Sequence, residues 1–93
     1  MKHYEAMVIL DPTVVDAEAE KLVKGFESEL VGSGGSIVSR DLQGKRALAY
    51  KVKGFREGIY ALLLFQAPSD GILKIEKKFK ITPQVLRYLL IKN

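Results

Sequence analysis

The stretch from Gly44 to Phe65 constrains the fold more than any other part of the chain. Residues 48–53 alternate: one side carries Leu, Tyr and Val, and the other carries Ala, Lys and Lys, as in a strand with one buried face. This pattern predicts that Tyr50 lies in the core. Glycines bracket a turn at residues 54–58, and residues 59–65 are apolar at every position. The stretch therefore predicts a basic outer strand folded back on an inner strand that is covered on both faces.

Two other segments have the apolar period of a helix that lies on a core. We expect Thr13 or Asp16 to cap the first helix, and residues 32–35 to end it. Residues 68–70 should cap the second helix, and Leu73 should extend its apolar side. The apolar stripes are Ala19, Leu22, Val23, Phe26 and Leu30 in the first helix, and Ile72, Ile75 and Phe79 in the second.

Strands are predicted at residues 2–10, 36–53, 59–66 and 85–92, with a bulge or bend near residues 42–44. The order is strand–helix–strand–strand–helix–strand. It predicts a single α+β domain over residues 1–93 with a ferredoxin-like fold, a four-stranded antiparallel sheet with two helices packed on one face. The first and third strands, which are the most apolar, should lie in the middle of the sheet.

Charge is unevenly distributed along a chain whose formal net charge is +4. Residues 13–31 carry five acidic and two basic side chains, whereas residues 36–58 carry six basic and two acidic ones. Residues 74–93 carry six basic side chains against one acidic. This excess of positive charge permits a polyanionic partner.

Few residues could support catalysis. Cysteine is absent, and the one histidine, His3, lies at the terminus. The acidic residues of the first helix have the spacing of a solvated face, and no metal-ligand cluster is evident. We therefore expect neither an enzyme nor a bound cofactor. The longest apolar run, residues 59–65, is too short for a membrane helix, and no signal peptide is evident. We therefore expect a cytoplasmic protein that does not associate with a membrane. We also expect no small-molecule substrate.

Two binding functions suit the predicted fold. An RNA-recognition motif requires aromatic residues on its third strand, and residues 57–64 place aliphatic residues or alanine at the stacking positions, so we reject it. A small-molecule-sensing or dimerisation module remains open, although the sequence shows no convergent polar ligand contacts.

Residues 44–53 resemble the signature of bacterial small-subunit ribosomal protein six. The shared features are a glycine, a basic residue two positions later, Leu-Ala-Tyr, then a β-branched residue and a base. The likeness extends over the whole chain, through Tyr4-Glu5, Asp11-Pro12, Gly58-x-Tyr60 and residues 81–92. Ala47 departs from the family, which usually has a polar or basic residue there.

The resemblance implies a structural component of the 30S subunit. Members of that family bind the central domain of 16S ribosomal RNA together with a neighbour, small-subunit ribosomal protein eighteen. Basic side chains would neutralise phosphates and release counterions. The RNA-binding residues that the resemblance implies are Lys45, Arg46, Lys51 and Lys53 on the second strand, Arg56 in the turn, Lys2 and His3 at the amino terminus, and Arg87 on the last strand.

Overall fold

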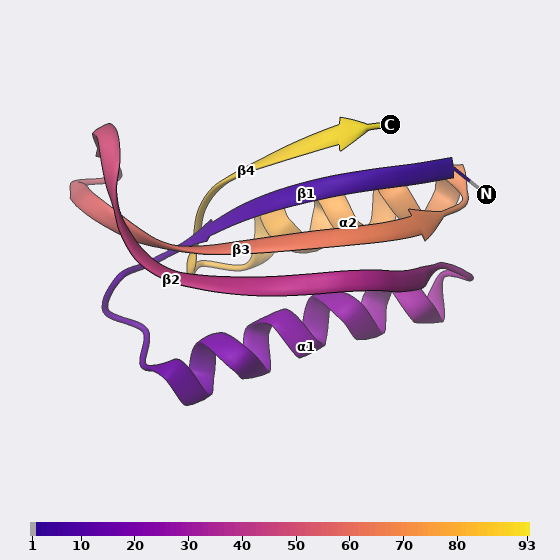
Figure 1. Ribbon diagram of the computed structural model, residues 1–93, viewed down its shortest axis with the longest axis horizontal. Helices are drawn as coiled ribbons and strands as arrows, with labels where there is room; N and C mark the ends of the chain where they lie inside the picture. Colours follow the sequence, from indigo (N-terminus) through magenta and orange to yellow (C-terminus); the bar gives the residue numbers. More distant parts are fainter. Residues whose placement is uncertain (1) are drawn as a thin grey trace.

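The computed structural model describes residues 2–93 as four strands and two helices. The strands form one antiparallel sheet in the order β2-β3-β1-β4, and both helices cover the same face of it (Figure 1). The predicted ferredoxin-like fold is confirmed, with the first and third strands in the middle. In chain order the elements are β1 (Lys2–Leu10), α1 (Asp16–Gly32), β2 (Ser36–Val52), β3 (Phe55–Ala67), α2 (Ser69–Ile81) and β4 (Val85–Lys92).

The core lies between the sheet and the helices. Alternate residues of β1 and β3, from Ala6 to Leu10 and from Ile59 to Ala67, are buried there. The rings of Phe26 on α1 and Phe79 on α2 meet edge to face, with centroids 5.0 Å apart. The predicted helix stripes supply this core, except that Leu73 is 69% exposed. The expectation that Leu73 extends the apolar side of its helix was wrong, because it lies on the outer side of α2.

Within residues 2–93, no helix covers the other face of the sheet. Residues that alternate with the core residues, such as Met7 on β1 and Leu62 on β3, are only half-buried. The prediction that residues 59–65 form an interior strand is confirmed, because β3 lies between β2 and β1, but residues 2–93 cover only one of its faces. The apolar run from residue 59 to 65 instead leaves an apolar surface on the uncovered face.

The end of β2 and the start of β3 form a hairpin that extends beyond the helices (Figure 1). Its turn consists of Lys53 and Gly54, with φ angles of 50° and 85°, as in the two-residue turns that suit the twist of hairpins. The predicted turn at residues 54–58 was too long, because β3 begins at Phe55. Tyr50 is 60% exposed, so its predicted place in the core was also wrong: no helix covers this part of the sheet.

Sequence reasoning predicted the bulge in β2 and the position at which α2 begins, but not the N-cap residue of α1. A register shift between Leu42 and Gly44 confirms the bulge. The N-cap residues are Val15 for α1 and Pro68 for α2, and neither helix has a side-chain cap hydrogen bond. Of the predicted caps of α1, Asp16 is the first residue of the helix, and Thr13 is engaged in the preceding loop, where its backbone N–H and hydroxyl donate to Asp11 Oδ1, at 2.8 and 2.7 Å.

Two glycines differ in the space around them, and this difference predicts opposite effects of substitution by alanine. A Cβ atom at Gly35 would lie 2.6 Å from the carbonyl oxygen of Gln66 and 2.9 Å from that of Leu30. Backbone atoms must then move, so Gly35→Ala should lower the free energy of unfolding by about 1–3 kcal/mol. A Cβ atom at Gly25, in the middle of α1, would meet nothing within 4 Å, and Gly25→Ala should raise stability by about 0.5–1 kcal/mol. Denaturant unfolding of both variants checks this; an equal effect of the two substitutions contradicts it.

Candidate nucleic-acid interface

Six of the eight predicted RNA-binding residues gather at one end of the molecule. We call them the hairpin-end group: Lys45, Arg46, Lys51, Lys53, Arg56 and Arg87, all of which are exposed. Five belong to the hairpin, with Arg56 on β3 rather than in the turn. Arg87 comes from β4, at the opposite edge of the sheet from β2. Contacts between the hairpin and β4 bring Arg87 into this group.

Those contacts involve Tyr50 and Lys53. The guanidinium carbon of Arg87 lies 5.5 Å from the ring centroid of Tyr50, and its Nη1 donates a hydrogen bond to the Tyr50 hydroxyl. Lys53 Nζ donates to the carbonyl oxygen of Val85, at 3.3 Å. The start of β4 and the tip of the hairpin are therefore joined, although they lie more than 30 residues apart in the sequence.

Arg46 and Lys45 face different sides of the hairpin. The guanidinium carbon of Arg46 lies 5.9 Å from the ring centroid of Tyr60, on the uncovered face. Arg46 and Tyr50 lie on the side of β2 that the sequence predicted to be buried. Both are exposed, because no apolar layer packs against this part of the hairpin. Lys45 pairs with the buried Ile59 and points toward the helix side.

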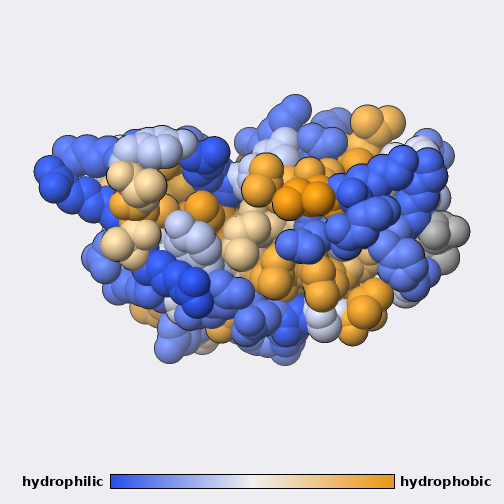
Figure 2. Space-filling model, turned by 45° about the horizontal axis from the view of Figure 1, so that its top comes forward, coloured by the Kyte–Doolittle hydropathy of each residue, from blue (hydrophilic) through white to orange (hydrophobic). Residues whose placement is uncertain are grey.

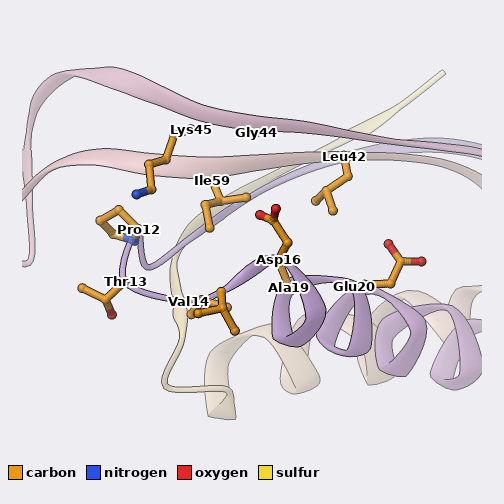
Figure 3. A pocket seen from close by; sticks show the side chains of 11 residues that line it. Pro12, Thr13, Val14, Asp16, Ala19, Glu20, Leu42, Gly44, Lys45 and Ile59 are labelled. Atoms are coloured by element: carbon orange, nitrogen blue, oxygen red, sulfur yellow. The ribbon is translucent and has the colours of Figure 1, made fainter.

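Lys45 overlooks a cavity of about 840 Å³ beside the start of α1 (Figure 3). Apolar and polar side chains both line this cavity; the carboxylate of Asp16 points from α1 toward the sheet, and Glu20 lies further along the helix (Figure 3). Glu20 is already engaged by Arg40. The cavity therefore offers one ammonium and one carboxylate without an ion-pair partner in residues 2–93.

Arg40 is the basic residue that the acidic helix neutralises. Its Nη2 donates to Glu20 Oε1, and its Nε lies 3.6 Å from Glu27 Oε1. The hydrogen bond from Arg40 lowers the pKa of Glu20 and raises the pKa of Arg40. Within residues 2–93 the ion pairs involve Arg40 alone. The cations of the hairpin-end group are thus free of carboxylate partners.

Lys2 and His3 lie at the far end of the 36 Å long axis from the hairpin (Figure 1). The predicted residues therefore form two groups rather than one. Sequence reasoning missed a third basic residue at this terminal end, Lys92, where hydrogen bonding and charge repulsion from Lys2 lower the pKa of Lys92. The antiparallel pairing of β1 with β4 brings the two lysines together. The predicted fold already implied this pairing, so it could have identified Lys92 as a candidate.

An apolar strip occupies the uncovered face of the sheet between the two basic ends (Figure 2). On β4, Leu89 is 58% and Ile91 is 42% exposed. The middle positions of β1 and β3 on this face are aliphatic, so they offer no aromatic platform for stacked bases. We call this surface the open-face strip; its apolar residues are Met7, Ile9, Leu62, Leu64, Leu89 and Ile91, and Glu5 lies on the same face between Leu64 and Ile91.

Residues 2–93 show neither a membrane span nor a metal-binding cluster. None of the described helices is both long and apolar enough to cross a membrane. The described acidic and histidine side chains form no group of three that could hold a metal ion.

Comparisons with known proteins agree on one family. A sequence model of the family described as Ribosomal protein S6 matches residues 3–92. Small ribosomal subunit protein bS6 of Nitratiruptor is 37% identical over 99% of this chain and 72% of its own length. The bS6 protein of Thermoanaerobacter pseudethanolicus is 39% identical over all of this chain and 98% of its own.

Solved structures agree as well. The crystal structure of 30S ribosomal protein S6 from Thermotoga maritima superimposes with a TM-score of 0.94 at 28% identity, covering 99% of this chain and 87% of that one. The carboxy-terminal domain of the Mycobacterium tuberculosis MgtC protein, with a TM-score of 0.53 and 16% identity over all of this chain and 88% of that one, shares the fold alone.

The ion pair between Glu20 and Arg40 predicts a pH dependence of stability. Because the pKa of Glu20 is lower in the folded state than its ordinary value of 4.5, the pair stabilises the protein above that value. The contribution is lost as the pH falls through the lowered pKa. Glu20→Gln should therefore reduce the melting temperature at pH 7 more than at pH 3. An equal difference between the variant and the wild type at both pH values would argue against this role.

Proposed function

This chain belongs to the ribosomal protein S6 family of the small ribosomal subunit, and we propose that it binds the central domain of 16S ribosomal RNA together with small-subunit protein eighteen. The observation that carries the proposal is the hairpin-end group, whose exposed cations have no carboxylate partner in residues 2–93. We further propose a structural role in the cytoplasmic ribosome, without catalysis, a cofactor or a small-molecule substrate.

The chemistry of the hairpin-end group suits a phosphate backbone. Lysine and arginine release condensed counterions when they neutralise phosphates, and arginine can bind one phosphate through two parallel hydrogen bonds. Such contacts orient a protein on RNA but distinguish few sequences. Because the uncovered face has no aromatic stacking platform, specificity would come from the shape of the folded RNA and from the partner protein.

The open-face strip is where we place protein eighteen. A mainly apolar surface with a polar surround is typical of a protein–protein contact, and the strip, which includes the carboxylate of Glu5, lies between the two basic ends (Figure 2). A protein that buries the strip would leave the cations at both of its ends free to contact RNA. These are the hairpin-end group at one end and Lys2, His3 and Lys92 at the other. RNA binding and partner binding would then use neighbouring surfaces and reinforce each other.

Removing cations from the hairpin should weaken RNA binding and reduce its salt dependence. In the triple variant Lys45→Ala, Arg46→Ala and Arg56→Ala, up to three phosphate contacts are lost. The slope of log affinity against log salt should become shallower by about 2, at roughly 0.7 per contact. Titration of central-domain 16S RNA in the presence of protein eighteen, at several salt concentrations, measures both quantities.

The matched control removes three exposed lysines from α2, on the helix side: Lys74→Ala, Lys77→Ala and Lys80→Ala. The control has the same change in net charge, so it separates local contacts from overall charge. If both triple variants lose affinity equally, the hairpin-end group is not the RNA-binding site.

A charge placed on the open-face strip should prevent partner binding. Leu89 is 58% exposed on the strip, and Leu73 is 69% exposed on α2, so neither substitution disturbs the core. Leu89→Lys should weaken binding of protein eighteen by about tenfold or more, because a buried unpaired charge is costly, whereas Leu73→Lys should bind as the wild type does. Calorimetric titration compares them, and loss of binding in Leu73→Lys alone would place the partner on the helix side.

A further inference from the structure

The hairpin that carries most of the RNA-binding candidates extends past the helices, so the core does not hold it in place. From residue 45 to residue 57 only Leu48, Val52 and Phe55 are even half-buried. A two-stranded ribbon of this kind is marginally stable by itself. Its position relative to the sheet must therefore depend on the contacts at its base and its tip.

At the base, the hairpin is seated on β1. Gly58 lies so close to the Ile9 side chain that a Cβ atom at that position would overlap with it. The same position would place a Cβ 3.6 Å from Leu48 Cδ2. This close packing fixes where the hairpin leaves the sheet, beside Lys45 and Arg46, but it does not include the residues nearer the tip, Lys51, Lys53 and Arg56.

Nearer the tip, the contact between Tyr50 and Arg87 ties the hairpin to β4. The guanidinium group lies at the hydroxyl end of the tyrosine ring and donates to the hydroxyl. The bond from Lys53 Nζ to the Val85 carbonyl oxygen lies beside it and links the turn to a residue that is only 4% exposed. Figure 1 shows the resulting bend, in which the hairpin rises from the β2 edge toward the side of β4.

We propose that Tyr50 is a positioning residue of the RNA interface, and that it holds the tip of the hairpin, which carries Lys51, Lys53 and Arg56, next to Arg87. The inference rests on the proposed function. Arg87 lies three strands away from β2 in the sheet order, so the two would form separate patches without this contact. A hairpin fixed before binding also avoids the ordering cost that a mobile one would incur when RNA binds.

The contact does not remove Arg87 from RNA binding. A guanidinium has five N–H donors, and a single hydrogen bond, from Nη1, goes to the Tyr50 hydroxyl. Arg87 is exposed, so its remaining donors can contact a phosphate. Tyr50 thus orients the Arg87 guanidinium, which itself binds RNA. The exposed ring of Tyr50 is not part of the core.

Hydrogen–deuterium exchange of the free chain tests the contact itself. Tyr50→Ala should speed exchange at residues 45–57 and leave β1 unchanged, because the core is untouched. Tyr50→Phe removes only the hydroxyl, keeps the ring beside Arg87 and should give a smaller increase. Tyr60→Phe is the matched control, because no hydrogen bond of the Tyr60 hydroxyl exists in residues 2–93 while its ring also faces an arginine. Unchanged exchange in Tyr50→Ala would overturn the proposal.

A double-mutant cycle with central-domain 16S RNA and protein eighteen tests the positioning role. Tyr50→Ala should weaken binding by roughly two- to tenfold. The double variant with Arg87→Ala should bind no more weakly than Arg87→Ala alone, because Tyr50 acts through Arg87. Additive losses would show that Tyr50 contacts RNA independently and would overturn the proposal. If the wild-type pair does not bind this RNA, the proposed function fails and the positioning role fails with it, whatever the exchange result.

Discussion

The one-sided covering of the sheet determines what the rest of the structure can do. Both helices pack on one face, where the apolar side chains of β1 and β3 meet Phe26 and Phe79. Burial of this apolar area is the main source of stability in a chain of 93 residues. The second face takes no part in that core, so its apolar residues and the hairpin beyond it are available for partners.

Sequence patterns predicted the elements well because the core imposes its period on them. The alternation in β1 and the stripe along α1 both reflect contact with one apolar layer. The same reasoning failed for Tyr50, because alternation predicts a buried side only where another layer exists to bury it. It failed for Leu73 for a related reason: an apolar residue at the margin of a stripe can lie on either side of the boundary with solvent.

The basic residues were predicted as candidates, but their partners could not be predicted. Arg40 and Arg46 look alike in the sequence, yet the structure pairs Arg40 with two carboxylates of α1 and leaves Arg46 on the open side. This difference depends on which strand faces the acidic helix, and it is a property of the tertiary structure. The joining of Arg87 to the hairpin through Tyr50 likewise depends on the bend of the ribbon, which no local pattern encodes.

The central claim is that cations of the hairpin contact RNA while the exposed lysines of α2 remain in solvent. Acetylation rates of individual lysines, compared between the free chain and its complex with central-domain 16S RNA and protein eighteen, test it most directly. The account predicts strong protection of Lys45 and Lys51, with unchanged rates at Lys74 and Lys77 on α2. Protection of the α2 lysines with free reaction at Lys45 and Lys51 would contradict it.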